Sequence, residues 1–411
     1  MPKRRQHRCR KWLVRFLLVL TTAWLVITQW QFPTVTGQPQ MAEMRGVWMT
    51  NLGSALMYYT TRLDETVGKL AQQHLNTVYP AVWNRGYTLH SSQVLQTASG
   101  RRRDPLTSLP VLPFQDPVRE WVYQAHRQHL RLIPWFEYGL MIPTSSALAQ
   151  AHPDWLTVNQ DGQQVEDPMQ PNSLFPKALQ NLQLEVTGGN QAWLNPFKPE
   201  VRQFLVDLIA EAVQQYEVDG IQLDDHFGLP VAFGYDEETV ALYRQEHGGA
   251  APPTDPTNSE WVRWRADKIS LLFRDISQAV KATRPEAVVS LSPNPPDFAY
   301  RNYLQDWRRW VDEGWVDEVV VQVYRDSAET LSASLEGSGL AAIAPSIPLS
   351  IGLYTGPFLD ATPMETIQQQ VEVVRSAGYN GVSFFSWETT FWLFRHESVN
   401  EEIWRSLFPQ R

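Results

Sequence analysis

Cysteine is almost absent from this chain of 411 residues. The single cysteine, Cys9, lies among arginines and lysines close to the N-terminus. The rest of the chain therefore has no material for a disulfide framework, a haem thiolate or a cysteine zinc site.

Nucleotide-binding motifs are missing as well. No G-x-G-x-x-G follows the first apolar run, and G-x-x-x-x-G-K-[ST] occurs nowhere in the sequence. We therefore expect no nucleotide and no other cofactor. The formal net charge is −9, and residues 1–30 contain no Asp or Glu, so the remaining body is more acidic than the whole. An acidic body excludes nucleic acid as the expected partner.

The first 30 residues differ from the rest of the chain. The basic stretch "MPKRRQHRCRK" is followed by the apolar stretch "WLVRFLLVLTTAWLVITQW", a pattern typical of an export signal. Its core, residues 16–27, is short for a membrane span, so a cleaved signal peptide and a membrane anchor at 12–30 both remain open. We predict an exported protein, periplasmic or at the cell surface, with a linker at 31–43 and one domain at 44–411.

The body repeats a pattern of short apolar runs, each followed by a helix-like segment. Eight such runs occur, at residues 44–50, 77–82, 130–136, 218–223, 287–291, 316–323, 349–353 and 381–385. Strand–helix alternation predicts a parallel sheet covered by helices, and eight units predict an α/β fold of the (β/α)8 TIM-barrel type. A doubly wound open sheet is the second choice.

Connection lengths favour the barrel. The segments from helix to strand are only a few residues long, whereas residues 84–116, 137–198 and 225–260 follow the second, third and fourth strands. TIM-barrel enzymes have this asymmetry because the loops after the strand C-termini build the active site.

Acidic and polar residues follow several of the predicted strands. Asp224, Asp225 and His226 end the fourth strand, Glu137 the third and Glu388 the eighth. Because side chains alternate along a strand, Asp224 should point into the barrel mouth and Asp225 should point elsewhere. The residues expected to contact substrate are Arg45, Trp83, Asn84, Arg85, Asp225, His226, Asn294, Gln322, Tyr324 and Trp387.

Several carboxyl groups at one barrel mouth favour glycoside hydrolysis. One carboxylate stabilises or attacks the anomeric carbon while a protonated one donates to the leaving oxygen. Asp224, Glu137 and Glu388 are the candidates, and retaining, inverting and substrate-assisted mechanisms are all open. In the structural alternative, Asp225 and Glu388 cap helices and His226 is a hydrogen-bonded structural residue.

Two other functions compete with this hypothesis. One is a carbohydrate-binding barrel that has a cleft but no turnover, with Trp83 and Trp387 holding the sugar. The other is a metal-dependent hydrolase such as a deacetylase, with Asp224, Asp225 and His226 as ligands. Because three adjacent residues rarely converge on one ion, we expect no metal here.

The sequence resembles the glycosyl-hydrolase-like 10 family, the DUF187 group of bacterial surface proteins. The resemblance covers residues 45–390 and rests on a set of stretches, which includes "RGVWMTN", "VYPAVWNRGYTLHSS", "PWFEYGLM", "LNPFKPEVRQFL", "VDGIQLDDHFGLP" and "GYNGVSFFSWE". It implies a TIM barrel that cleaves a bacterial envelope polysaccharide, with peptidoglycan glycan strands as a candidate. Family motifs fall on Arg45, Asn84, Arg85, Glu137, Asp224, Asp225, Gln322, Tyr324 and Glu388.

The chain departs from the family pattern at two places. His226 stands where the family more often has an aromatic residue, and "VQVYR" stands where "PQxYW" is usual. Both departures lie next to the predicted site, so they affect the expected glycan specificity.

Overall fold

The computed structural model describes most of the predicted domain. The described residues are 15–16, 18–19, 33–35, 43–51, 53, 63–107, 116–165, 190–356, 361–390 and 407–408. The predicted signal or anchor segment and the linker lie almost wholly outside them. Among the described residues, no helix has both the length and the apolar character needed to cross a membrane.

One parallel sheet forms the centre of the molecule. Its strands are β1 (Met44–Met49), β2 (Thr77–Pro80), β5 (Arg131–Leu132), β6 (Trp135–Phe136), β9 (Gly220–Asp224), β10 (Val288–Ser292), β11 (Glu318–Gln322), β12 (Leu349–Tyr354) and β13 (Gly381–Phe385). All eight predicted strands are present, and β5 and β6 are two pieces of the third. The break falls at Ile133 and Pro134, where proline has no N–H to donate to a neighbouring strand.

The sheet closes on itself. Its order is β5-β2-β1-β13-β12-β11-β10-β9-β6, so the two ends of the order are the two pieces of one strand. β5 pairs with β2, β6 pairs with β9, and an isolated bridge joins Ala81 to Trp135. The closed ring confirms the predicted (β/α)8 barrel, because a doubly wound sheet would keep two open edges.

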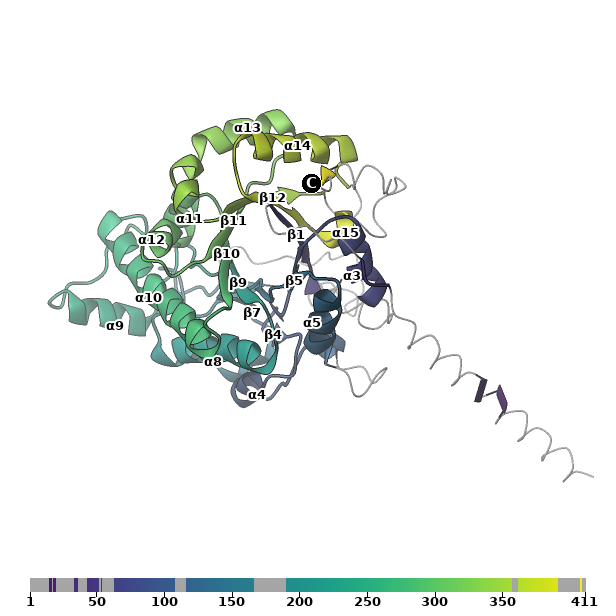
Figure 1. The fold of residues 1–411 in the computed structure, drawn as a ribbon. Coiled ribbons are helices and arrows are strands. Elements are labelled where there is room, and N and C mark those ends of the chain that lie inside the picture. Colours follow the sequence, from purple (N-terminus) through teal and green to yellow (C-terminus); the bar gives the residue numbers. More distant parts are fainter. Residues whose placement is uncertain are drawn as a thin grey trace, which may run out of the picture.

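Helices surround the ring of strands (Figure 1). They are α3 (Leu63–Gln72), α5 (Pro117–Arg127), α8 (Pro199–Gln215), α10 (Ser259–Thr283), α12 (Trp307–Asp312), α13 (Ala328–Gly337), α14 (Met364–Ser376) and the short α15 (Trp387–Thr390). One face of α8 is apolar and buried, as shown by Val201, Leu205 and Leu208. These residues recur at four- and three-residue steps, the spacing of a helix that covers a sheet with one face.

Local sequence fixes where the helices begin. The Asp116 side chain accepts from the backbone N–H groups of Val118 and Arg119, and Pro117 occupies the first turn of α5. Asn258 caps α10 in the same way. These side chains satisfy N–H groups that have no partner within the helix.

Side chains fill the interior of the barrel. Trp48, Tyr79 and Trp135 are buried there, and Trp48 Nε1 donates to Gln222 Oε1 over 2.6 Å. Gln222 in turn donates from Nε2 to Ser290 Oγ over 3.0 Å. The barrel is therefore a packed core, and any substrate must bind at one of its ends.

The long loops after the strands carry small elements of their own. The described ones are β3 (Trp83–Asn84), β4 (Tyr87–Thr88), α4 (Gln93–Ser99), η1 (Pro105–Thr107), β7 (Met141–Pro143), α6 (Ala147–Ala151), η2 (Pro153–Trp155), β8 (Gln191–Trp193), α9 (Glu237–Glu246) and α11 (Pro296–Tyr303). Two further short helices, η3 (Leu340–Ala342) and η4 (Ala344–Ser346), lie between α13 and β12. β7 and β8 form the antiparallel pair of the third loop. The same loop contains a turn at Asp161 and Gly162, with Gly162 at a φ of 75°.

Candidate active site

Asp224 is the last residue of β9 and is buried. Its Oδ1 accepts hydrogen bonds from Ser292 Oγ at 2.9 Å, Gln322 Nε2 at 2.6 Å and its neighbour's backbone N–H at 2.8 Å. Ser292 and Gln322 end the next two strands of the ring, β10 and β11. Asp224 thus points to the inside of the barrel mouth, as strand alternation predicts.

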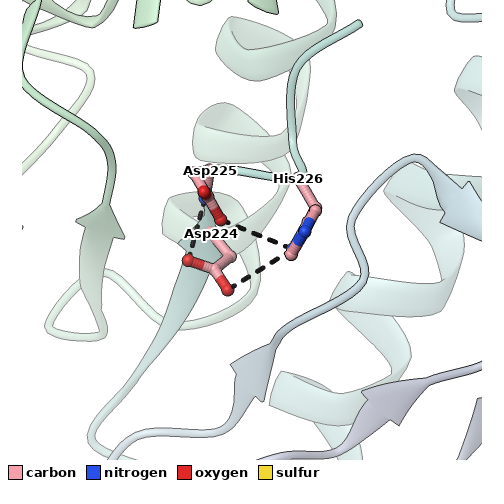
Figure 2. A group of neighbouring side chains, drawn as sticks. All are labelled: Asp224, Asp225 and His226. Carbon is pink, nitrogen blue, oxygen red and sulfur yellow. Dashed lines mark hydrogen bonds and ion pairs between the residues drawn. The ribbon is translucent and has the colours of Figure 1, made fainter. Parts of the chain in front are cut away.

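The prediction that Asp225 turns away from Asp224 was wrong. Figure 2 shows the two carboxylates beside the ring of His226, whose Nδ1 lies 3.4 Å from Asp225 Oδ1 and 3.8 Å from Asp224 Oδ2. Asn294 donates to Asp225 Oδ2 over 2.8 Å. The chain leaves the strand in a turn at Asp224, and the alternation of side chains ends with the strand.

His226 is hydrogen-bonded, as its structural interpretation expected. Its Nδ1 lies 3.1 Å from the backbone oxygen of Glu137. Burial lowers the pKa of His226, but the charges of Asp225, Asp224 and Glu137 outweigh it and raise the pKa to about 10. A protonated His226 therefore places one positive charge between the acids at neutral pH.

Glu137 follows β6 directly and belongs to the same end of the barrel. Asn84, in β3, donates from Nδ2 to Glu137 Oε2 over 2.6 Å. Arg85 holds that amide by donating from Nε to Asn84 Oδ1 over 2.9 Å, and its Nη2 pairs with Asp104 at 3.2 Å. Asn51 also donates to Asp104, over 2.7 Å. Residues that follow the first two strands of the barrel thus orient Glu137, at the end of the third.

Glu388 lies in α15, just past β13, and is fully buried. Its Oε1 accepts from the backbone N–H and the hydroxyl of Thr50, at 3.0 and 2.6 Å. Its Oε2 has no hydrogen-bond partner among the described residues. Burial raises the pKa of Glu388, because a desolvated carboxylate is disfavoured relative to the neutral acid.

Two of these carboxyl groups titrate near neutrality. Burial raises the pKa of Glu137 to about 7, and the charge of Glu388 adds to that rise while Asn84, His226 and Arg85 oppose it. Burial also raises the pKa of Asp224 to about 7, with Asp225 adding to the rise and His226 opposing it. Each group can therefore hold or release a proton at physiological pH.

The effects of the acids on one another's pKa values show that they lie together at the barrel mouth. Glu388 and Glu137 interact strongly enough for the charge of one to raise the pKa of the other. Burial raises the pKa of Tyr324, and the nearby charges of Asp224, Asp225 and Glu137 add to that rise. The Tyr324 ring stacks on Phe385, with centroids 5.8 Å apart. The structure therefore brings most of the predicted residues to one mouth: Asn84, Arg85, Glu137, Asp224, Asp225, His226, Asn294, Gln322, Tyr324 and Glu388.

The remaining three predicted residues are Arg45, Trp83 and Trp387. None of them lies where it could contact a substrate at the barrel mouth. Arg45 lies near the start of β1, where it pairs with Glu43 at 2.9 Å and covers the ring of Phe408. Trp83 and Trp387 belong to the buried core, and Trp83 Nε1 donates to a backbone oxygen over 3.0 Å. Neither tryptophan offers an exposed face for a sugar.

Two residues of the site were not predicted. Thr50 directly follows β1 and is the last residue of the first predicted run, 44–50, so its place at a strand end is the signal that could have found it. Asp104 stands in a long loop, with no periodicity to indicate its contacts with Asn51 and Arg85.

Within the part of the chain that the structure describes, one group of residues has the donor atoms to hold a metal ion. Ligand atoms of Asp224, Asp225 and His226 all lie within 4.8 Å of one another, so adjacent residues do converge here, contrary to the expectation. The same Nδ1 of His226 faces both carboxylates, and a metal would have to replace its proton. The charges of Asp225 and Asp224 raise the pKa of His226, so protonation competes with a metal for this nitrogen.

Solved structures of glycoside hydrolases share this fold. The glycoside hydrolase domain of PgaB (BpsB) from Bordetella bronchiseptica superposes with a TM-score of 0.57 at 12% identity, over 84% of this chain and 95% of that one. The catalytic domain of a β-amylase from Paenibacillus polymyxa gives a TM-score of 0.54 at 11% identity, over 88% and 95%. At this identity the likeness shows a common fold.

Two curated relatives are similar along the sequence. Glycosyl hydrolase YngK of Bacillus subtilis is 24% identical over 348 residues, which cover 77% of this chain and 60% of that protein. Glycosyl hydrolase DigH of Escherichia coli is 25% identical over 327 residues, 71% of this chain and 68% of the relative. This chain thus spans less than two thirds of the Bacillus protein. Residues 43–374 match the family described as Glycosyl hydrolase-like 10, and the chain belongs to that family.

Proposed function

We propose that this protein is a glycosidase that cleaves O-glycosidic bonds of a bacterial envelope polysaccharide. The observation that carries the proposal is the pair of buried carboxyl groups at the ends of adjacent strands, Glu137 and Asp224, whose pKa values both lie near 7. Glycoside hydrolysis needs two carboxyl groups in opposite protonation states. A pair that titrates around physiological pH can supply both.

Hydrogen bonding favours different roles for the two groups. Asp224 Oδ1 accepts three hydrogen bonds, and Oδ2 lies on the side of the His226 cation. These donors stabilise the ionised form, which suits the group that attacks or stabilises the anomeric carbon. Glu137 accepts a side-chain hydrogen bond from Asn84 at Oε2, and burial beside Glu388 favours its protonated form. In the proposed mechanism Glu137 gives its proton to the leaving oxygen.

Glu388 supports this division as the third acid. Its unpartnered Oε2 is buried at the same mouth, and its charge raises the pKa of Glu137. An ionised Glu388 would keep Glu137 protonated at a pH where an isolated glutamate has lost its proton. A sugar hydroxyl would give Oε2 the hydrogen bond that it lacks.

Peptidoglycan glycan strands are the first substrate to test. The export pattern of residues 1–30 supports an envelope location, and relatives over most of the chain bear the name glycosyl hydrolase. We also propose that residues 1–30 direct the protein out of the cytoplasm, as a cleaved signal peptide or as a membrane anchor at 12–30. A fusion of residues 1–43 to alkaline phosphatase tests this proposal. Phosphatase activity in whole cells is expected, and an inactive cytoplasmic fusion would contradict it.

Reducing-end release tests the activity. The full-length protein is incubated with peptidoglycan glycan strands and with other bacterial polysaccharides, and new reducing ends are measured. We expect release from at least one envelope glycan and none from the Asp224→Asn variant. No release from any glycan, or equal release by the variant, would contradict the proposal. The same assay with a chelator distinguishes this mechanism from a metal-dependent hydrolase, because paired-carboxylate catalysis does not depend on a divalent ion.

The Glu137 role is tested with two leaving groups. Glu137→Gln keeps an oxygen for Asn84 but cannot donate a proton as an acid. We expect this variant to lose activity on glycans while keeping most of its activity on an aryl glycoside whose phenolate leaves without protonation. Equal loss on both substrates would show that Glu137 is not the proton donor.

A further inference from the structure

A pocket of about 480 Å³ opens at the rim beside the acids. Its lining includes Asn294 and Gln322, which contact the acids, and also Asp297, Phe298, Arg325 and Ser334. Its size lies within the range of about 300–1,000 Å³ that is usual for small-molecule sites. None of the last four residues takes part in the proposed chemistry, so the pocket is a separate feature of the same rim.

Two side chains connect the pocket to the carboxyl groups. Gln322 donates to Asp224 Oδ1 over 2.6 Å, and Asn294 donates to Asp225 Oδ2 over 2.8 Å. A polysaccharide bound at Asp224 would therefore place a neighbouring sugar unit within reach of the pocket.

The pocket contains an exposed aromatic ring. Phe298 lies on α11 with 49% of its surface exposed, an unusual exposure for a phenylalanine in a chain that buries most of its large apolar side chains. An exposed aromatic face in a pocket can cover the apolar face of a sugar ring. Trp83 and Trp387 are buried, so Phe298 can take the stacking role that sequence alone gave to those tryptophans.

Arg325 adds a fixed positive charge. Its Nε donates to Ser334 Oγ over 2.6 Å and its Nη1 donates to the backbone oxygen of Tyr324 over 2.7 Å. The side chain is exposed, yet these two contacts hold its guanidinium in one orientation. Its Nη2 has no partner among the described residues, and no ion pair there neutralises the charge. A held guanidinium with free N–H groups is suited to a carboxylate.

We propose that this pocket, lined by Phe298 and Arg325, binds a sugar unit that carries a carboxylate, next to the bond that is cleaved. The inference rests on the proposed function for its position along the glycan. Phe298 covers the ring, Arg325 binds the carboxylate, and Asp297 accepts hydrogen bonds from hydroxyls. Uronic acids and N-acetylmuramic acid with a free lactyl group both have this chemistry.

Binding without turnover tests the pocket. In the full-length Asp224→Asn protein, titration calorimetry measures three oligosaccharides of equal length: uncharged chitin, alternating N-acetylglucosamine and N-acetylmuramic acid, and a uronic-acid oligomer. We expect at least one carboxylated oligosaccharide to bind more tightly than chitin, and the tighter of the two identifies the source. Equal affinity for all three would overturn the carboxylate assignment.

Two variants and two matched controls locate the binding. Phe298→Ala should weaken every oligosaccharide by roughly fivefold to tenfold, and Arg325→Gln should weaken only the carboxylated ones, by about tenfold or more. Tyr123→Ala removes an equally exposed ring from α5, and Arg308→Gln removes an exposed arginine from α12. Neither control should change affinity. Unchanged binding in both pocket variants would overturn the inference.

The same proteins separate this inference from the proposed function. If the protein with Asp224 intact releases no reducing ends while Arg325→Gln weakens carboxylated glycans, the proposed function fails and the pocket stands. If the protein cleaves glycans and neither pocket variant changes their binding, the function stands and the pocket fails.

Discussion

Asn84 donates a hydrogen bond of 2.6 Å to Oε2 of Glu137, and this contact joins the loop after the second strand to the end of the third. The bond opposes the effect of burial, because a donor stabilises the ionised carboxylate. Arg85 orients the same amide through its oxygen. The protonation of Glu137 is thus set jointly by residues from two loops.

Asn84→Ala should raise the pKa of Glu137 above about 7, since the variant loses the donor and keeps the burial. Carbon NMR titration of the labelled Glu137 carboxyl, assigned with Glu137→Gln, measures the change. Asn294→Ala is the matched control, because Asn294 donates to Asp225. A Glu137 pKa that stays constant or falls in Asn84→Ala would contradict the prediction.

Asp224→Asn should lower the rate of glycan cleavage by on the order of a thousandfold. The variant keeps the oxygen that accepts from Ser292 and Gln322, so its fold should be preserved. Asp225→Asn is the matched comparison, and it should cost less because Asp225 is not one of the two carboxyl groups proposed to react with the glycan. Initial rates of reducing-end release measure both, and an equal loss in the two variants would remove the distinction between them.

Stability should depend on pH through Glu137. Its pKa is 4.5 in the unfolded chain and about 7 in the folded protein, so between these values the native state binds a proton that the unfolded state has lost. The free energy of unfolding therefore falls as the pH rises from about 4.5 to about 7.

The Glu137→Gln variant has no ionisable group at this position. Its free energy of unfolding should therefore lack the decrease with pH that Glu137 causes. The stability of the variant relative to the unchanged protein should increase across the same interval, by at most about 3 kcal/mol. Denaturant unfolding at a series of pH values measures the difference. A difference that is constant between pH 4.5 and 7 would show that the Glu137 pKa is not raised.

Gly53→Ala should disturb Glu388. A Cβ atom at Gly53 would clash with Glu388 Oε1, the oxygen that accepts from Thr50. The carboxyl group must move, and we expect a stability loss of about 1–3 kcal/mol together with reduced activity. Gly337→Ala is the control for stability, since a Cβ there meets nothing within 4 Å. Thermal unfolding of both variants checks the prediction, which fails if their melting temperatures are equal.

Regular patterns in the sequence predicted the regular parts of the structure. Apolar runs and helix spacing gave eight strands and the closed barrel, because burial imposes those periods on any sheet covered by helices. Alternation placed Asp224 correctly, since Asp224 is still within β9. The break at Pro134 was missed, although proline is the residue that interrupts a strand's hydrogen bonds.

Predictions failed where contacts between distant segments decide the outcome. Asp225 and His226 lie in a turn whose geometry follows from packing against Glu137. Trp83 and Trp387 occupy strand ends but pack into the core. The spacing of apolar residues along a strand or helix predicts neither the direction of a turn nor the burial of a single tryptophan.

The bond between Thr50 and Glu388 spans 338 positions and joins the first strand to the segment after the last one. During synthesis, Glu388 leaves the ribosome long after Glu137 and Asp224 have been made. A nascent chain can begin to fold its earlier strands, but the three acids meet only when the final strand docks and the ring closes. The order of translation therefore delays assembly of the acidic mouth until nearly the whole domain exists.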